Sequence, residues 1–186
     1  CNLFKNLSIG FNPKFFTSIQ IKKFFNKHNK VKSIESNLID QIHKSKIKSN
    51  KPFFSLKSKV VGENYKTKII KIRKYLNKNK SDYLFITAPE NVAWLLNIRG
   101  HDNPNSPIPN CHLILDNKNS FYLITYKSKV SKLIKEKKLK SYQIIEPENF
   151  NKFISNLKGK KIIIDKNTCS IFFENLIKKK FKIFKK

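Results

Sequence analysis

The side chains that most often ligate metals or act as nucleophiles are few in this sequence: three cysteines and four histidines. The cysteines are far apart, odd in number, and form no C-x-x-C pair (Cys1, Cys111 and Cys169). This spacing argues against a disulfide framework or a zinc ribbon and favours reduced, mostly buried thiols in a reducing compartment. The histidines form neither H-E-x-x-H nor H-x-H (His28, His43, His101 and His112).

Acidic side chains offer no metal cage either. The chain contains 12 aspartates and glutamates, and they are scattered. In the central region, four acidic residues are expected at the ends of a strand, a helix and a loop, and their spacing is not that of metal ligands (Asp82, Glu90, Asp102 and Asp116). His101 next to Asp102 is the only hint of a polar site, and a solvated loop histidine is the preferred interpretation.

Residues 87–109, "TAPENVAWLLNIRGHDNPNSPIP", collect residue types that are rare elsewhere in the chain. They include the only tryptophan, the only two alanines, one of two arginines and one of four glycines. Three prolines follow within six positions, and each fixes φ and removes a backbone donor (Pro104, Pro107 and Pro109). The window therefore predicts a strand, a helix and a stiff, extended loop, on which another domain could dock.

Each notable residue in this window has a structural and a functional interpretation. We expect Trp94 to pack into the core from a helix face, the alternative being an indole that lines a substrate channel. Arg99 and Asp102 are expected to form a salt bridge that pins the loop; alternatively Arg99 points toward another domain and shapes a substrate entrance or interface. Asn97 reads as a cap or a loop-bonding amide. The candidates for a substrate channel or a domain interface are Trp94, Asn97, Arg99, His101 and Asp102.

The formal charge of +28 invites a nucleic-acid function, but its composition argues against one. All but two of the 40 basic residues are lysines, whereas arginine is the better reader of bases and phosphates. Lys, Asn, Ile, Phe and Tyr share A/T-rich codons, so drift in base composition explains lysines spread over the whole length. We expect weak, nonspecific adhesion to nucleic acid at low salt only.

The composition favours a soluble, cytoplasmic chain with an ample core. Hydrophobic residues make up 39% of the sequence, with 16 phenylalanines, so disorder is not expected. Uninterrupted apolar runs reach about five residues, far below the roughly 20 that a membrane helix needs. The first residue is Cys1, and the ending "KKKFKIFKK" breaks off within a possible strand, so we expect a fragment.

The first 60 residues read as the end of one unit and a connector. "LSIGF" and "VKSIES" predict strands, and Thr17-x-x-Gln20 predicts a capping box at the start of a helix. Asn37 could cap a short helix, "NLIDQIHK". Residues 44–60 are rich in Lys, Ser and Pro without a steady period, and we place the domain boundary there, with domains over 1–60 and 61–186.

From Gly62 onward, strand and helix patterns alternate. "NYKTKIIKIRKYLNK" predicts a helix, "SDYLFIT" a strand, and Thr87-x-x-Glu90 a second capping box with Pro89 in the first turn and Gly100 as a left-handed stop. "CHLILD" and "SFYLIT" predict an antiparallel hairpin. A Lys-rich helix over 127–138, strand "SYQIIE", helix "ENFNKFISNL", strand "KKIIID" and helix "SIFFENLIKKK" follow. This order predicts an α/β fold with a mixed sheet flanked by helices.

Four segments together resemble one protein family. "SDYLFITAPENVAWLLNIRGHDNPNSPIPNCHLIL" is similar to the middle domain of aminopeptidase P, the Xaa-Pro aminopeptidases of the creatinase/prolidase superfamily, with its A-W-L-x-N-x-R-G-x-D pattern. "IGFNPKFFT" resembles the family's G-x-D-P-x-x-x-T, with Asn12 in the place of Asp, and "ESNLIDQIH" its N-L-x-D-x-x-W, with His43 in the place of Trp. "VGENYKTKIIKIRKYL" resembles the helix that opens the middle domain, through Gly62, Lys68 and Arg73.

The resemblance implies creatinase N-terminal-like domains from a three-domain cytoplasmic enzyme that removes the residue preceding proline from the N-terminus of peptides. Its catalytic domain would bind two divalent metal ions, usually manganese, through two Asp, one His and two Glu. None of those ligands can be assigned here, so this segment alone is expected to be inactive. The implied partners are the chain's own C-terminal catalytic domain, proline-containing peptides and a second copy in a homodimer, with no specific nucleic acid and no membrane.

Three other interpretations stay open. A creatinase-like or prolidase-like enzyme would belong to the same superfamily, although the long two-unit N-terminal region argues against it. A free-standing interaction module would belong to another class, as would a basic nucleic-acid-binding protein. The sequence that follows Lys186 would distinguish the first two from the aminopeptidase. Salt-sensitive binding that survives competition by unrelated polyanions would identify the third.

Overall fold

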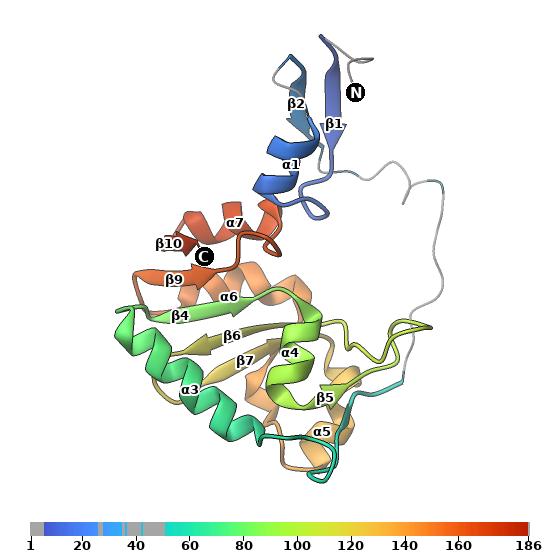
Figure 1. The fold of residues 1–186 in the computed structure, drawn as a ribbon, viewed down its shortest axis with the longest axis vertical. Coiled ribbons are helices and arrows are strands. Elements are labelled where there is room, and N and C mark those ends of the chain that lie inside the picture. The colour runs from blue at the N-terminus through green and yellow to red at the C-terminus, as the bar shows by residue number, and fades with distance from the viewer. Residues whose placement is uncertain (1–5, 26–27, 35, 37–41, 43–50, 186) are drawn as a thin grey trace.

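The computed structural model describes residues 6–25, 28–34, 36, 42 and 51–185. Its N-terminal unit contains β1 (Ser8–Phe11), α1 (Ser18–Phe24) and β2 (Lys30–Ser33), with β1 and β2 in parallel (Figure 1). The predicted capping box is confirmed, since the Thr17 hydroxyl accepts from the Gln20 N–H and the Gln20 side chain accepts from the Thr17 N–H. The helix predicted to begin after Asn37 lies outside the described residues.

A six-stranded mixed sheet forms the centre of the second unit, in the order β10-β9-β4-β6-β7-β8. Its strands are β4 (Tyr83–Ile86), β6 (His112–Asp116), β7 (Phe121–Ile124), β8 (Ile144–Ile145), β9 (Lys161–Ile164) and β10 (Lys182–Lys185). β6 runs antiparallel to both its neighbours, and the remaining pairs are parallel. The predicted α/β class, mixed sheet and β6–β7 hairpin are therefore confirmed.

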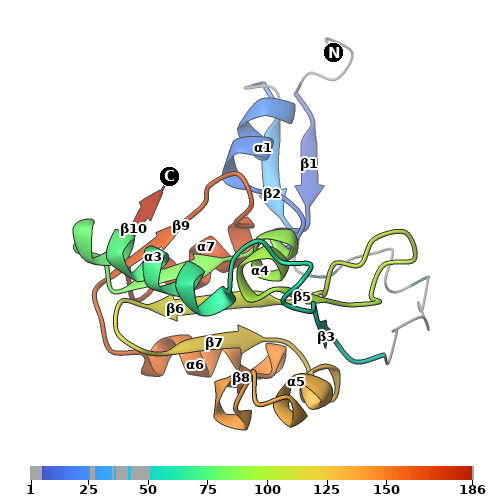
Figure 2. The same ribbon diagram turned by 60° about the horizontal axis from the view of Figure 1, so that its bottom comes forward.

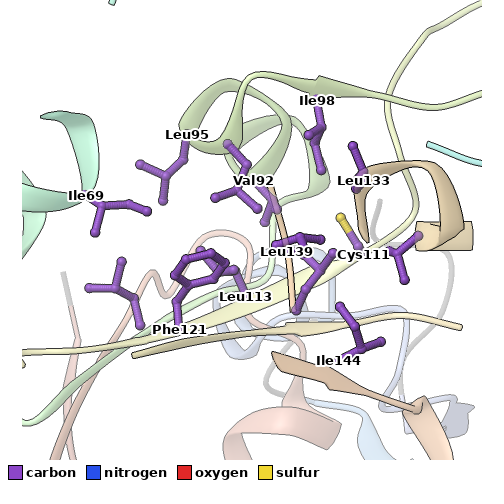
Figure 3. Packing of buried hydrophobic residues seen from close by; sticks show 14 of the residues in the cluster. Ile69, Val92, Leu95, Ile98, Cys111, Leu113, Phe121, Leu133, Leu139 and Ile144 are labelled. Carbon is purple, nitrogen blue, oxygen red and sulfur yellow. The ribbon is translucent and has the colours of Figure 1, made fainter. Parts of the chain in front are cut away.

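Helices cover both faces of this sheet. They are α3 (Tyr65–Lys78), α4 (Pro89–Leu96), α5 (Ser131–Lys135), α6 (Phe150–Asn156) and α7 (Ile171–Lys178). Figure 2 shows α3 and α4 on one side of the strands and α6 on the other. Alternate residues of β6 serve the two faces: Leu113 and Leu115 pack with α3, α4 and α5, and Ile114 packs with α6 and α7. The first of these cores is seen in Figure 3.

The end of the predicted connector packs against the second unit. β3 (Phe54–Ser55) pairs antiparallel with β5 (Ile98–Arg99), the strand that follows α4. Phe53 is completely buried in the core between the sheet and α4. The segment just before residue 61 therefore contributes to the fold around α4, and the domain boundary at residues 60 and 61 stays a prediction.

The N-terminal unit docks on the first turn of α7 (Figure 1). The N–H groups of Ile171 and Phe172 donate to the carbonyls of Phe16 and Pro13, at 2.9 and 3.0 Å. The Ser18 hydroxyl donates to buried Glu174, 2.6 Å away. Because the first N–H groups of a helix have no partner within the helix, the N-terminal unit supplies acceptors that α7 needs.

Two predicted elements are shorter in the structure. The Lys-rich helix expected over 127–138 is a 3-10 turn (Lys127–Val130) followed by the short α5. The chain turns back after α5, where Lys137 has a left-handed φ of 54° and Leu139 is buried. The strand expected over "SYQIIE" is reduced to β8, because Ser141–Gln143 form a 3-10 turn and Pro147 opens another.

The predicted ends of α4 are wrong in two respects. Ala88, not Thr87, is the N-cap residue, and the Thr87 hydroxyl instead lies 3.0 Å from that of Thr168 on the loop after β9. Pro89 is at the first helical position, as expected. The left-handed stop is Asn97, with φ 51° and ψ 47°, and not Gly100.

Gly100 has a different physical reason to be glycine. A Cβ atom there would lie 2.8 Å from the Cα of Pro109 and 3.0 Å from the ring of Phe53. The Gly100 N–H also donates to the Pro107 carbonyl at 2.9 Å. The proline-containing loop thus returns onto Gly100 at a distance that excludes any side chain.

Replacing Gly100 by Ala should therefore lower the free energy of unfolding by about 1–3 kcal/mol, because the backbone of Pro109 cannot move freely. Gly62→Ala is the matched control, since no atom lies within 4 Å of its added Cβ. It should change stability by less than about 1 kcal/mol, in the stabilising direction. Urea denaturation followed by circular dichroism measures both. Equal stability of the two variants would contradict the close approach.

Candidate functional site

Trp94 lies on the exposed side of α4, so the expected core position is wrong. Its side chain is 59% exposed, while Val92, Leu95 and Leu96 take the face that packs on the sheet. One face of the indole is covered by the Lys68 ammonium, which lies 4.1 Å from the ring centroid. This distance is typical of a cation–π contact, which leaves the outer face of the ring open to solvent.

Asn97 is the cap that the sequence predicts, and it joins α4 to α3. Its side-chain oxygen accepts from the Lys68 ammonium at 2.8 Å, and its side-chain nitrogen donates to the Glu63 carbonyl at 2.8 Å. Lys68 also donates to the Trp94 carbonyl at 2.7 Å. The Asn97 carbonyl accepts from Lys138 at 3.1 Å. Two cations therefore meet the carboxyl end of α4, where the helix dipole favours positive charge.

Burial perturbs both lysines. Desolvation lowers the pKa of Lys68, an effect that the carboxylate of Glu63 partly opposes and Arg99 adds to. Desolvation likewise lowers the pKa of Lys138 to about 8, against the attraction of Glu136. The ammonium of Lys138 lies 5.0 Å from the Tyr65 ring. Both lysines are thus held by carbonyl oxygens, an amide oxygen and aromatic faces rather than by direct ion pairs.

The predicted salt bridge between Arg99 and Asp102 is wrong. Arg99 donates to the carbonyls of Ala93 and Ile98, at 3.3 and 2.8 Å. Asp102 instead pairs with Lys129, 2.5 Å away, and both of those side chains are nearly buried. It also accepts from the Asn110 N–H at 2.6 Å. The loop is therefore tied to the turn after β7, a partner that lies 27 residues away in the sequence.

His101 does not extend this network. It is exposed, as the solvated-loop interpretation expects, and its ring stacks on Phe54 with centroids 5.2 Å apart. Cys111 and Cys169 are buried, as predicted, and burial raises the pKa of Cys111 above its ordinary value. The structure therefore brings Trp94 and Asn97 together through Lys68, and places His101 apart from them.

Sequence reasoning missed the roles of three polar residues. Lys129 was hidden among 38 lysines, and Lys68 was named only as part of a family motif. Lys68 nevertheless lies between apolar positions on the buried face of a helix. His112 is the third: its Nδ1 donates to the Thr87 carbonyl at 2.8 Å, and burial lowers its pKa. Its position at the start of a buried strand, beside Cys111, was the available signal.

Metal ligation finds no support in the part of the chain that the structure describes. Within it, no three side chains of His, Cys, Asp or Glu are grouped so that they could hold an ion. No metal-assisted step is therefore assigned to these residues. The same residues contain no helix with the length and apolarity needed to cross a membrane.

Lys68→Met should lower the free energy of unfolding by about 1–3 kcal/mol, because the Asn97 oxygen and the Trp94 carbonyl would lose their donor inside the fold. Lys66→Met, on the exposed side of the same helix, should cost less than about 0.5 kcal/mol. Urea denaturation compares them. Fluorescence of the only tryptophan gives a second measurement, since Lys68→Met removes the cation from its face. Unchanged emission together with equal stability of both variants would refute the role of Lys68.

Lys138 should make stability depend on pH. Its folded pKa of about 8 lies below its ordinary value of 10.5, so between these values the unfolded chain binds more protons. Its contribution to stability must therefore rise as pH increases through this range. The free energy of unfolding of the wild type should rise relative to that of Lys138→Met from pH 8 to pH 10.5. Lys132→Met, an exposed control on α5, should stay parallel to the wild type, and parallel curves for Lys138→Met would contradict this assignment.

Comparison with known proteins agrees with this fold. The profile of the creatinase/prolidase N-terminal domain matches residues 44–186. "Probable Xaa-Pro aminopeptidase P" from Botryotinia fuckeliana is 31% identical over 107 residues, 54% of this chain and 16% of that protein. Its counterpart from Neurospora crassa is 28% identical over 149 residues, 76% of this chain and 22% of that protein. The matched part of the chain thus spans less than a quarter of the length of either relative.

A solved structure shows the same fold over nearly the whole chain. It is that of X-prolyl aminopeptidase from Caenorhabditis elegans, described as a cytosolic enzyme with a di-nuclear active site. The TM-score is 0.78 at 20% identity, over 99% of this chain and 32% of that one. The predicted resemblance is therefore confirmed, and because the family profile covers more than three quarters of the sequence, this chain belongs to the creatinase/prolidase N-terminal domain family.

Proposed function

We propose that this chain is a noncatalytic N-terminal and middle-domain portion of a cytoplasmic, metal-dependent Xaa-Pro aminopeptidase. The whole enzyme would remove the N-terminal residue that precedes proline in peptides. The relatives that carry this name, and the fraction of their length that the chain spans, support the proposal. The two divalent ions, manganese by family resemblance, would be held by residues other than those described, since these form no suitable cluster.

One observation supports a specific role: an exposed aromatic face, that of Trp94, is held in a fixed position by its neighbours. Lys68 holds the inner face of the indole, and Asn97 ends the helix just beyond it. In the loop that follows, the Gly100 N–H donates to the Pro107 carbonyl, and Asp102 forms a salt bridge with Lys129. An aromatic surface held in this way loses little conformational entropy on binding, which suits a contact between domains or with a substrate.

The segment 94–102 would therefore shape access to a catalytic domain of the same protein. Arg99 is engaged by carbonyl groups, so its contribution would be to hold the loop that carries His101 and Asp102. Exposed aromatic residues are also common in contacts between subunits, and a homodimer is the assembly we propose. Proline-containing peptides are the proposed substrates.

The test is Trp94→Ala in the longest protein that the gene encodes. Its catalytic efficiency on Xaa-Pro peptides should fall about tenfold, the equivalent of about 1.4 kcal/mol in the transition state. Because the indole is exposed, the unfolding temperature should change little. Tyr142→Ala removes another exposed aromatic ring, 66% accessible, and should leave activity intact.

Size-exclusion chromatography and metal analysis of both variants accompany the assay. An encoded protein without manganese-dependent release of the residue before proline would refute the enzyme assignment. Wild-type efficiency, stability and oligomeric state in Trp94→Ala would refute the role of this surface while leaving the enzyme assignment intact.

A further inference from the structure

A cavity of about 870 Å³ opens where the N-terminal unit meets the sheet. It lies at the carboxyl ends of β7 and β8 and the start of β6, which runs in the opposite direction. Thr125 and His112 line it from the sheet, and Lys14 and Phe15 from the N-terminal unit. Its volume is within the range of small-molecule sites, and the carboxyl edge is where ligands bind to α/β sheets.

The walls of this cavity are largely aromatic. The contributing rings are those of Phe15, Tyr126, Phe150, Phe172 and Phe173. Phe173 is central: its ring centroid lies 5.4 Å from that of Phe150 and 5.3 Å from that of Phe172, both edge to face. The mutual contacts hold these rings in place, whereas Phe15, which the N-terminal unit contributes, is 65% exposed. Such walls suit a bulky apolar group.

His112 gives the cavity a hydrogen-bond acceptor. A carbonyl can only accept, so the Nδ1 atom that contacts the Thr87 carbonyl at 2.8 Å carries the proton. In the neutral imidazole Nε2 is then an acceptor, and no described residue donates to it. Phe85 and Phe173 hold the ring edge to face, with centroids 6.2 and 5.0 Å away. Burial lowers its pKa and so favours this neutral form.

Lys14 gives the cavity a positive charge without a carboxylate partner among the described residues. Its ammonium lies 5.4 Å from the centroid of Phe172. The other charges have partners already: Lys129 pairs with Asp102, and Glu148 accepts from the Tyr126 hydroxyl at 3.1 Å. The chain as a whole carries +28, which raises the local concentration of anions. An anionic group beside Lys14 is therefore favoured.

We propose that this cavity binds an N-acylated aromatic amino acid with a free carboxylate. The carboxylate would lie near Lys14, the amide N–H would donate to Nε2 of His112, and the ring would pack against Phe15 and the other aromatic walls. The inference does not depend on the proposed peptidase activity, because it concerns groups that this chain supplies by itself.

The test uses N-acetylphenylalanine as the probe and the complete chain as the protein, in isothermal titration calorimetry. A dissociation constant of about 1 mM or below is expected for a ligand of this size. N-acetylphenylalaninamide, which lacks the carboxylate, should bind about threefold or more weakly. Lys14→Gln and Phe15→Ala should each weaken binding of N-acetylphenylalanine by a similar factor or more.

Both substitutions replace exposed side chains, so the variants should fold, and their unfolding temperatures verify this. Lys22→Gln is the matched control, since it removes an equal charge from the same unit without lining the cavity, and it should bind like the wild type. Absence of binding up to about 10 mM would overturn the proposal. So would equal affinity of the wild type, Lys14→Gln and Phe15→Ala for the probe.

Discussion

The hydrogen bonds of one buried ammonium group, that of Lys68, hold together the region on which the proposed role depends. An ammonium removed from water is costly unless acceptors surround it. Here the Trp94 carbonyl and the Asn97 amide oxygen supply them, and the indole face covers it. The same contacts satisfy groups that the end of a helix would otherwise leave without partners. The Lys68 side chain thus links α3 directly to the end of α4.

The position of the end of α4 determines where residues 98–102 lie. Since α4 ends at Asn97, Ile98 and Arg99 can pair with Phe54 and Ser55, which places completely buried Phe53 beneath the loop. The loop then closes through the contacts of Gly100 with Pro107 and of Asp102 with Lys129. Four separate parts of the chain, the connector, α3, α4 and the turn after β7, therefore fix one surface. This explains why glycine, proline, tryptophan and arginine are concentrated there in a chain otherwise rich in lysine.

The N-terminal unit depends on a different kind of contact. Backbone carbonyls of Pro13 and Phe16 accept from the first turn of α7, and Ser18 reaches the carboxylate of Glu174. Backbone acceptors place few demands on side-chain identity, so such docking tolerates drift in composition. This unit adds Lys14 and Phe15 to the walls of the aromatic cavity, which the sheet and its helices otherwise build. The junction between the units is thus both a structural contact and the place where a binding site can form.

The sequence by itself predicted most of the elements, because strand and helix periods, the Thr17 cap, Pro89 and the apolar runs are local properties. The order of the elements gave the mixed α/β class, and the collinear motifs gave the family. Only the tertiary structure decided which partners the polar residues have. Asp102 pairs with Lys129 and not with the nearby Arg99. Lys68 packs against the Trp94 indole, which helical spacing alone could have placed in the core. These partners depend on how strands distant in sequence become neighbours in the sheet. A local pattern can mark a buried lysine, as it does for Lys68, but it does not reveal which groups that lysine will contact.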